Sequence, residues 1–377
     1  WVFGESISPP DSLLGALGTV GLILIVLEAA LDLKLLKEKV GVIVQSLIVG
    51  CLGLGITSYL SALMLGVFLD MDFLSALLVT IPLSILSSAI ILPSIDSLDE
   101  KRREFMIYES TFSDIVGIVG FYSVMSMVNT EGANGVYGLI IGNLVFTIVF
   151  SVVASYFLIY VFQSLKSHAK LFLLISVLLL LFAIGKMFHL SSLIIILIFG
   201  VILNNYRLFF SGFMKDFIVP EKIEEILNNF KIITIESAFV VRTFFFIVFG
   251  WSIYLGTLLD YKVWLIGVCL LVVIYLVRAL VLFVFNGTTV LEKIVPELFL
   301  APRGLITILL FYAIPSSIKD EHPEFDGILL FIILSSCLIM TWSLIKEKKK
   351  VEVSNVLEEK EGLGGAEDSE EEEMKFE

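Results

Sequence analysis

The chain has 377 residues, of which 58% are hydrophobic and only 17% are charged, and its mean hydropathy is +0.99. A soluble domain carries about 25% charged residues, so this composition excludes a soluble globular fold and, with it, a soluble enzyme. The net charge of −13 comes in large part from the acidic run at 367–373. Such a run is typical of a solvated tail, and we expect no nucleic-acid partner.

Apolar segments about 20 residues long recur along the chain, separated by short polar breaks. A helix of that length crosses a bilayer core about 30 Å thick, and backbone groups in lipid must bond within their own helix. The sequence therefore predicts an all-α integral membrane protein with about eleven spans, at 13–33, 40–67, 73–95, 104–128, 136–164, 170–188, 191–210, 231–255, 262–286, 296–316 and 326–346.

Lysine and arginine gather in every second connection, beginning with Lys34, Lys37 and Lys39 after the first span. Because basic loops stay in the cytoplasm, we expect an extracytoplasmic N-terminus at 1–12. Segment 211–230 mixes charged and apolar residues, which predicts an amphipathic cytoplasmic linker. It would separate a first helical bundle at 13–210 from a second at 231–346, followed by an acidic disordered cytoplasmic tail at 347–377.

Ionisable residues inside the spans are costly and usually functional or paired. The candidates here are Glu28, Glu109, Asp114, Lys186, Glu236, Arg242, Arg278 and Arg303. On the span 104–128, a helical turn of about 100° per residue puts Ser110 and Asp114 on one face and Glu109 about 140° away from Asp114. One acid can then face a cavity while the other faces a packed helix. A carboxylate in such a cavity holds a proton or a small cation in competition.

Arg278 lies in the middle of its span and keeps its proton, so it needs a buried anion. We predict Glu109 as its partner, which leaves Asp114 free to titrate. Arg242 has two possible arrangements: a pair with Glu236 across helices, since the two lie six residues apart and do not share a face, or a side chain extended to the membrane surface.

Two spans are predicted to be broken. Span 73–95 combines Pro82 with a run of hydroxyl residues, and span 296–316 contains Pro302, Arg303 and Gly304 near its cytoplasmic entrance. Discontinuous helices at mid-membrane mark ion sites in transporters that are built from inverted repeats.

The segment Glu109-Ser110-x-x-Ser113-Asp114 resembles the E-S-x-x-N-D motif of cation:proton antiporters of the sodium/proton exchanger type. The segment from Arg242 to Gly250, the Arg278 span, Pro302-Arg303-Gly304-Leu305 and the early acidic helix with Glu28 resemble further signatures of that family, in its order, over residues 13–346. The eleven spans would correspond to spans three to thirteen of a thirteen-helix fold with inverted repeats.

The resemblance implies a role for each matching residue. Asp114 would bind Na⁺ or K⁺ and carry the proton, with Glu109 and Arg278 as a structural ion pair. The two broken helices would cross at the site. Members are generally homodimers that work by an elevator-like alternating access, and no cofactor is expected. Further ion- and proton-binding positions are Ser113, Ser110, Glu28 and Ser87.

Two departures from the family pattern bear on the ion. Ser113 stands where the family has Asn or Asp, so its contact with the neighbouring helix must be shorter. Ser87-Ser88-Ala89 stands where many members have Thr-Asp-Pro, so one acidic group is missing at the helix break. The sequence does not decide between Na⁺ and K⁺.

The expected function is electroneutral exchange of a monovalent cation for H⁺ in the cell membrane, in contact with lipid, because one titrating carboxylate remains at the motif. Two alternatives stay open. An inverted-repeat organic-anion carrier predicts a cationic cavity, and a degenerate, non-transporting membrane sensor predicts no flux.

Overall fold

The computed structural model describes residues 11–95, 98–128, 136–164, 170–187, 192–210, 218–252, 255–286 and 295–348. Within these ranges every regular element is a helix, as the composition predicts. Five of the described helices are individually long and apolar enough to cross a membrane, namely those at Lys37–Leu69, Phe73–Ser94, Glu100–Val128, Tyr261–Phe285 and Phe325–Lys348. The prediction of an all-α integral membrane protein is confirmed.

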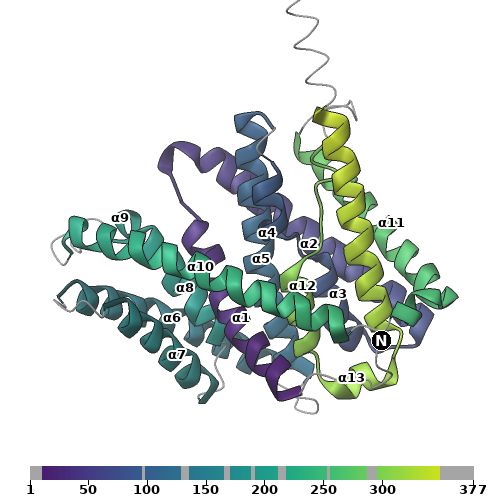
Figure 1. Ribbon diagram of the computed structural model, residues 1–377, viewed down its shortest axis with the longest axis horizontal. Helices are drawn as coiled ribbons and strands as arrows, with labels where there is room; N and C mark the ends of the chain where they lie inside the picture. Colours follow the sequence, from purple (N-terminus) through teal and green to yellow (C-terminus); the bar gives the residue numbers. More distant parts are fainter. Residues whose placement is uncertain are drawn as a thin grey trace, which may run out of the picture.

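The helices follow the expected spans closely (Figure 1). In chain order they are α1 (Asp11–Asp32), α2 (Val40–Leu69), α3 (Phe73–Ser84), α4 (Ser88–Ile91), α5 (Glu100–Val128), α6 (Val136–Ser164), α7 (Lys170–Met187), α8 (Ser192–Asn204), α9 (Tyr206–Phe209), α10 (Pro220–Ser252), α11 (Tyr261–Asn286), α12 (Leu305–Ala313), α13 (Ser316–Glu321) and the last helix, Phe325–Lys348. Short 3₁₀ turns lie at Lys37–Lys39, Leu92–Ser94 and Leu255–Leu259.

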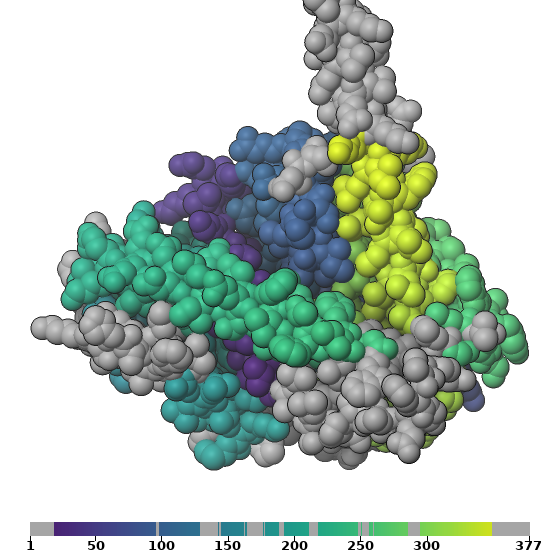
Figure 2. Space-filling model, viewed as in Figure 1, coloured from purple at the N-terminus to yellow at the C-terminus, as the bar shows by residue number. Residues whose placement is uncertain are grey.

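Helix α10 differs from the expectation. The predicted linker at 211–230 and the predicted span at 231–255 are one continuous helix from Pro220 onward, and residues 211–217 lie outside the described residues. Proline suits the first helical turn, and Glu221 complements the positive end of the helix dipole. Ile223, Leu227 and Phe230 are buried at helical spacing, so the amphipathic segment is packed as the start of α10. In Figure 2, α10 lies across the face in view.

The helices form two groups that do not follow chain order. Helices α1, α6, α7, α8 and α10 pack on one another, and α2, α3, α4, α5, α11 and α12 form the second group. The two groups meet mainly where α1 contacts α5 and α12, with further contacts from α6 and α8 to α5. The expected division into consecutive bundles at 13–210 and 231–346 does not describe this packing. A polar break marks a loop but carries no information on which helices pack together.

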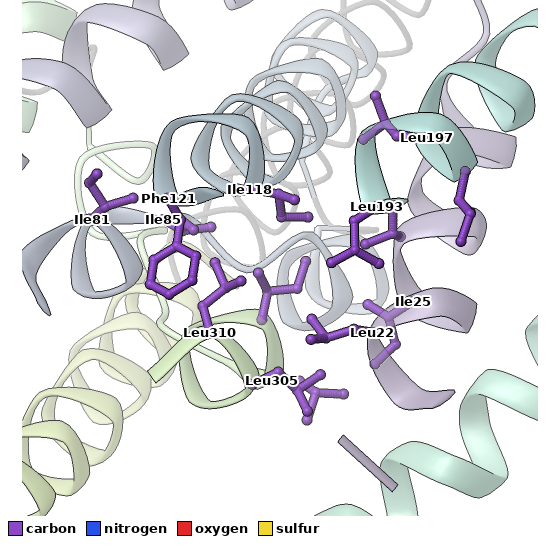
Figure 3. Close-up of a cluster of buried hydrophobic side chains, with 14 of the residues drawn as sticks. Leu22, Ile25, Ile81, Ile85, Ile118, Phe121, Leu193, Leu197, Leu305 and Leu310 are labelled. Atoms are coloured by element: carbon purple, nitrogen blue, oxygen red, sulfur yellow. The ribbon is translucent and has the colours of Figure 1, made fainter. Parts of the chain in front are cut away.

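Buried apolar side chains from both groups meet in one cluster (Figure 3). Those labelled there come from α1, α8, α3 and the break after it, α5 and α12; they are Leu22, Ile25, Leu193, Leu197, Ile81, Ile85, Ile118, Phe121, Leu305 and Leu310. Every one of them is at most 7% exposed. The contact between the two groups is therefore largely apolar.

Helix α11 carries an exposed apolar face. One face carries Leu265, Val272, Leu276 and Leu280, each at least half exposed, at spacings of seven and four residues. In water such an exposed apolar stripe would be an aggregation surface. Such a stripe is typical of a helix that spans a membrane, as the length and composition of α11 indicate.

Candidate functional site

Two broken helices cross near the centre of the second group. Helix α3 ends at Ser84, the chain is extended from Ile85 to Ser87, and α4 begins at Ser88. The segment at 295–304 is likewise non-helical, and α12 begins after it at Leu305. The backbone N–H of Ser87 donates to the carbonyl of Pro302 at 3.0 Å, which joins the two breaks. A Cβ at position 304 would overlap the side chain of Ser87, so this approach requires glycine.

Arg303 holds the crossing together. Its guanidinium donates from Nε to the carbonyl of Leu83 at 2.6 Å and from Nη1 to the carbonyl of Ala301 at 3.1 Å, and the residue is 2% exposed. The Leu83 carbonyl lies at the C-terminal end of α3, where carbonyls lack helical partners and the helix dipole is negative. Arg303 therefore stabilises the end of a half-helix inside the membrane. The backbone N–H of Arg303 donates to Ser336 Oγ at 3.0 Å.

Asp114 lies on α5 beside this crossing and is fully buried. Its Oδ2 accepts hydrogen bonds from the hydroxyl of Ser88 and, at 3.4 Å, from the backbone N–H of Ser88. Within the part of the chain that the structure describes, no donor reaches the other oxygen, Oδ1. The carboxylate is thus anchored through one oxygen while the other keeps its capacity to bind.

A cavity of about 30 Å³ adjoins Asp114. A buried water needs a cavity of about 10–15 Å³, so this cavity has room for one or two waters or a small ion. It lies between the two helix groups: α1 and α10 line one side, and α4, α5 and α12 line the other. The lining residues are Ile25, Glu28, Ala29, Asp32, Ser87, Ser88, Ala89, Leu92, Asp114, Arg242, Leu305 and Ile306.

Two ion pairs link α1 to α10 beside the cavity. Arg242 Nη2 lies 2.5 Å from Glu28 Oε2, and Lys231 Nζ lies 2.7 Å from Asp32 Oδ1. Both expectations for Arg242 are wrong, since Glu236 is exposed on α10 and the guanidinium binds Glu28 rather than extending to the membrane surface. The physical reason is that α10 packs directly on α1, a contact that the order of the chain does not reveal.

The carboxylate of Glu109 is held by Arg278 in a bidentate pair between α5 and α11. The Nη1–Oε1 and Nη2–Oε2 distances are 2.8 and 3.1 Å, and the side chains are 8% exposed for Arg278 and 2% for Glu109. Arg278 also donates from Nε and Nη2 to the carbonyl of Glu297, at 3.0 and 2.8 Å. This pair lines a second cavity of about 20 Å³, separate from the one at Asp114. Glu109 and Asp114 therefore face different surroundings on one helix.

The structure does not bring Ser110 or Ser113 to the Asp114 cavity. Ser110 Oγ donates to the carbonyl of Met106, one turn back at 2.8 Å, as helical serines commonly do. Ser113 Oγ accepts from the backbone N–H of Leu86 at 3.0 Å, so it satisfies a backbone group in the break of the neighbouring span. Ser87 and Glu28 do line the cavity.

Sequence reasoning missed two residues of the site, Ser88 and Arg242. The signal for Ser88 was present, because it stands at the acidic position of the family's Thr-Asp-Pro pattern and within a run of hydroxyls. For Arg242 the signal was its charge inside a span, without any indication of its partner.

Comparison with known proteins places this geometry in a family. Residues 1–346 match the family model described as sodium/hydrogen exchanger, transmembrane. The fold is similar to a structure of the sodium proton antiporter MjNhaP1 from Methanocaldococcus jannaschii at pH 8, with a TM-score of 0.64 and 19% identity over 89% of this chain and 84% of that chain. An electron-microscopy structure of the same antiporter gives a TM-score of 0.60 and 18% identity over 90% and 84% of the respective chains.

The comparison with curated proteins found no match. At identities below 20% the two structures establish a shared fold alone, whereas the family model covers almost all of the helical part of the chain. This chain belongs to the transmembrane sodium/hydrogen exchanger family.

Proposed function

We propose that this protein exchanges Na⁺ or K⁺ for H⁺ across the membrane, with Asp114 as the group that carries either ion. One observation carries the proposal. The Asp114 carboxylate is fully buried and anchored through Oδ2, and its Oδ1 has no partner among the described residues. The carboxylate adjoins a cavity large enough for a small ion.

The chemistry follows from competition at one carboxylate. A protonated Asp114 is neutral and binds a cation poorly, whereas an ionised Asp114 needs a compensating charge in this buried position. Na⁺ and K⁺ favour oxygen ligands. The cavity lining offers the carboxylate of Asp114 and the hydroxyls of Ser87 and Ser88, beside the carboxylates of Glu28 and Asp32, which are paired with Arg242 and Lys231. Binding of the cation and release of the proton are then two halves of one exchange.

The charge balance favours electroneutral exchange. The other two carboxylates that line the cavity are already paired, Glu28 with Arg242 and Asp32 with Lys231. Asp114 is then the carboxylate whose charge changes during the cycle, so one proton leaves for each cation bound. The lining carries three carboxylates and one guanidinium, and this anionic balance disfavours the alternative of an organic-anion carrier.

Alternating access fits the position of the cavity. It lies between two helix groups whose contact is largely apolar, and apolar contacts are non-directional, so one group can slide on the other. Such a shift would expose Asp114 first to one side and then to the other. We place the protein in the cell membrane as a homodimer, with its C-terminal tail in the cytoplasm.

Replacement of Asp114 by Asn tests the central claim, because Asn keeps the shape and loses the competition between proton and cation. Purified Asp114→Asn in liposomes under a pH gradient should show no proton flux driven by Na⁺, K⁺ or Li⁺, while the protein stays folded and inserted. Asp260→Asn, at an exposed site before α11, is the matched control and should retain exchange. Cation-driven proton flux in the Asp114 variant at the wild-type rate would overturn the proposal.

A further inference from the structure

The charges around the Asp114 cavity reach it from three helices. Helix α1 contributes Glu28 and Asp32, α10 contributes Arg242, and α5 contributes Asp114. The cavity-lining residues from α4, α12 and the breaks before them carry no charge. Lys231 of α10 pairs with Asp32 just beside the cavity. With all three acids ionised, the two cations leave a net charge of one negative elementary charge.

Arg242 determines that balance. Its Nη2 lies 2.5 Å from Glu28 Oε2, and the two side chains are only 21% and 18% exposed, so little water screens the pair. The Nε of Arg242 is buried with no acceptor among the described residues. Arginine stays charged at all accessible pH values, so the compensation of Glu28 is permanent.

We propose, on the basis of the function proposed above, that Arg242 is a specificity-determining residue that restricts the Asp114 cavity to monovalent cations by holding Glu28 in an ion pair. With Glu28 compensated, one carboxylate charge is available to an ion in the cavity. Without Arg242 the same small cavity would present two uncompensated carboxylates, Glu28 and Asp114. The affinity of a protein site for divalent cations depends strongly on the number of charged carboxylates that it offers.

The test replaces Arg242 by Gln and measures cation binding directly. Detergent-solubilised protein is heated with increasing Na⁺ or Ca²⁺, because an ion that binds only the folded state raises the melting temperature. We expect Ca²⁺ to raise the melting temperature of Arg242→Gln at concentrations at least tenfold below those needed for wild type. In liposomes the same variant should be inhibited by Ca²⁺ at concentrations at least tenfold lower than wild type.

Two controls separate a charge effect from a structural one. The double variant Glu28→Gln with Arg242→Gln removes both charges and should return to the wild-type response to Ca²⁺. Arg207→Gln removes an exposed arginine that pairs with Glu224 of α10. Neither residue lines the cavity, so this variant should also respond as wild type does. An Arg242→Gln protein with wild-type responses to Ca²⁺ in both assays would overturn the inference, as would a Ca²⁺ effect that persists in the double variant.

A second variant decides the matter if Arg242→Gln yields no folded protein. Glu28→Gln leaves Arg242 uncompensated beside the cavity, so the apparent KM for Na⁺ should rise at least tenfold; an unchanged KM would contradict the inference. Failure of the proposed function has a different signature. Asp114→Asn would then still exchange ions, whereas the melting experiments on Arg242→Gln do not depend on transport.

Discussion

Replacement of Glu109 by Gln should damage the stability of the protein more than its chemistry. The side chain is 2% exposed and both carboxylate oxygens accept hydrogen bonds from Arg278, at 2.8 and 3.1 Å. Gln has the same length but no charge and a single acceptor oxygen. Among the described residues, Arg278 would then have one neutral acceptor oxygen at position 109, the Glu297 carbonyl and a distant contact with the sulfur of Met106.

The magnitude follows from the burial of the pair. Removal of one partner from a buried ion pair leaves an uncompensated charge in a medium of low dielectric constant and costs about 3–5 kcal/mol. Glu109→Gln should therefore express poorly or melt at a clearly lower temperature. The double variant with Arg278→Gln should recover part of that loss, because neither position of the pair then carries an uncompensated buried charge. The coupling energy from the double-mutant cycle should fall between about 0.5 and 3 kcal/mol.

The assay is thermal unfolding of detergent-solubilised protein, combined with exchange measurements in liposomes. Glu224→Gln makes the same chemical change in an exposed pair with Arg207 and should leave the melting temperature almost unchanged. If the two single variants at 109 and 278 are harmless and their effects add strictly, the pair does not stabilise the fold and the reasoning is refuted.

Two more predictions concern the crossing of the broken helices. Ser88→Ala removes the hydroxyl that donates to Asp114, so the carboxylate should hold its proton more tightly. Because a charge-assisted hydrogen bond contributes about 1.5–3 kcal/mol, the apparent KM for Na⁺ at fixed pH should rise tenfold or more; an unchanged KM would contradict this contact. Gly304→Ala places a Cβ on the side chain of Ser87 and should cost about 1–3 kcal/mol of stability. A melting temperature equal to that of wild type would show that Ser87 and position 304 can move apart enough to accommodate the Cβ.

The parts of this architecture that depend on local pattern were predictable from sequence. Span positions follow from apolar length, and the break at Pro82 to Ser88 follows from proline beside hydroxyl residues. The partner of Arg278 was also predictable, because a guanidinium buried in the membrane requires an anion. Only a few acids lie inside spans, and Glu109 faces away from Asp114 on its helix.

Features that depend on packing between distant segments were not predictable. The pair between Glu28 and Arg242 joins residues 214 positions apart and has no local signature on either helix. The hydroxyls of Ser110 and Ser113 were assigned to the ion by their place in a motif. Each instead forms its hydrogen bond to a backbone group, and spacing on a helix does not determine which polar group a short hydroxyl side chain selects.

The positions of the ion pairs suggest how the molecule can move without losing them. Glu109 and Arg278 both belong to the group of α2–α5, α11 and α12, whereas Glu28 and Arg242 both belong to the group of α1, α6–α8 and α10. Each of these two pairs therefore lies within one group and survives a displacement of one group against the other. Breaking a pair at the interface would cost about 3–5 kcal/mol at every cycle. Asp114 is on one side of the contact between the groups and the Glu28–Arg242 pair on the other. The displacement that we propose would therefore change the electrostatic surroundings of an ion bound at Asp114 and leave the ion pairs within each group intact.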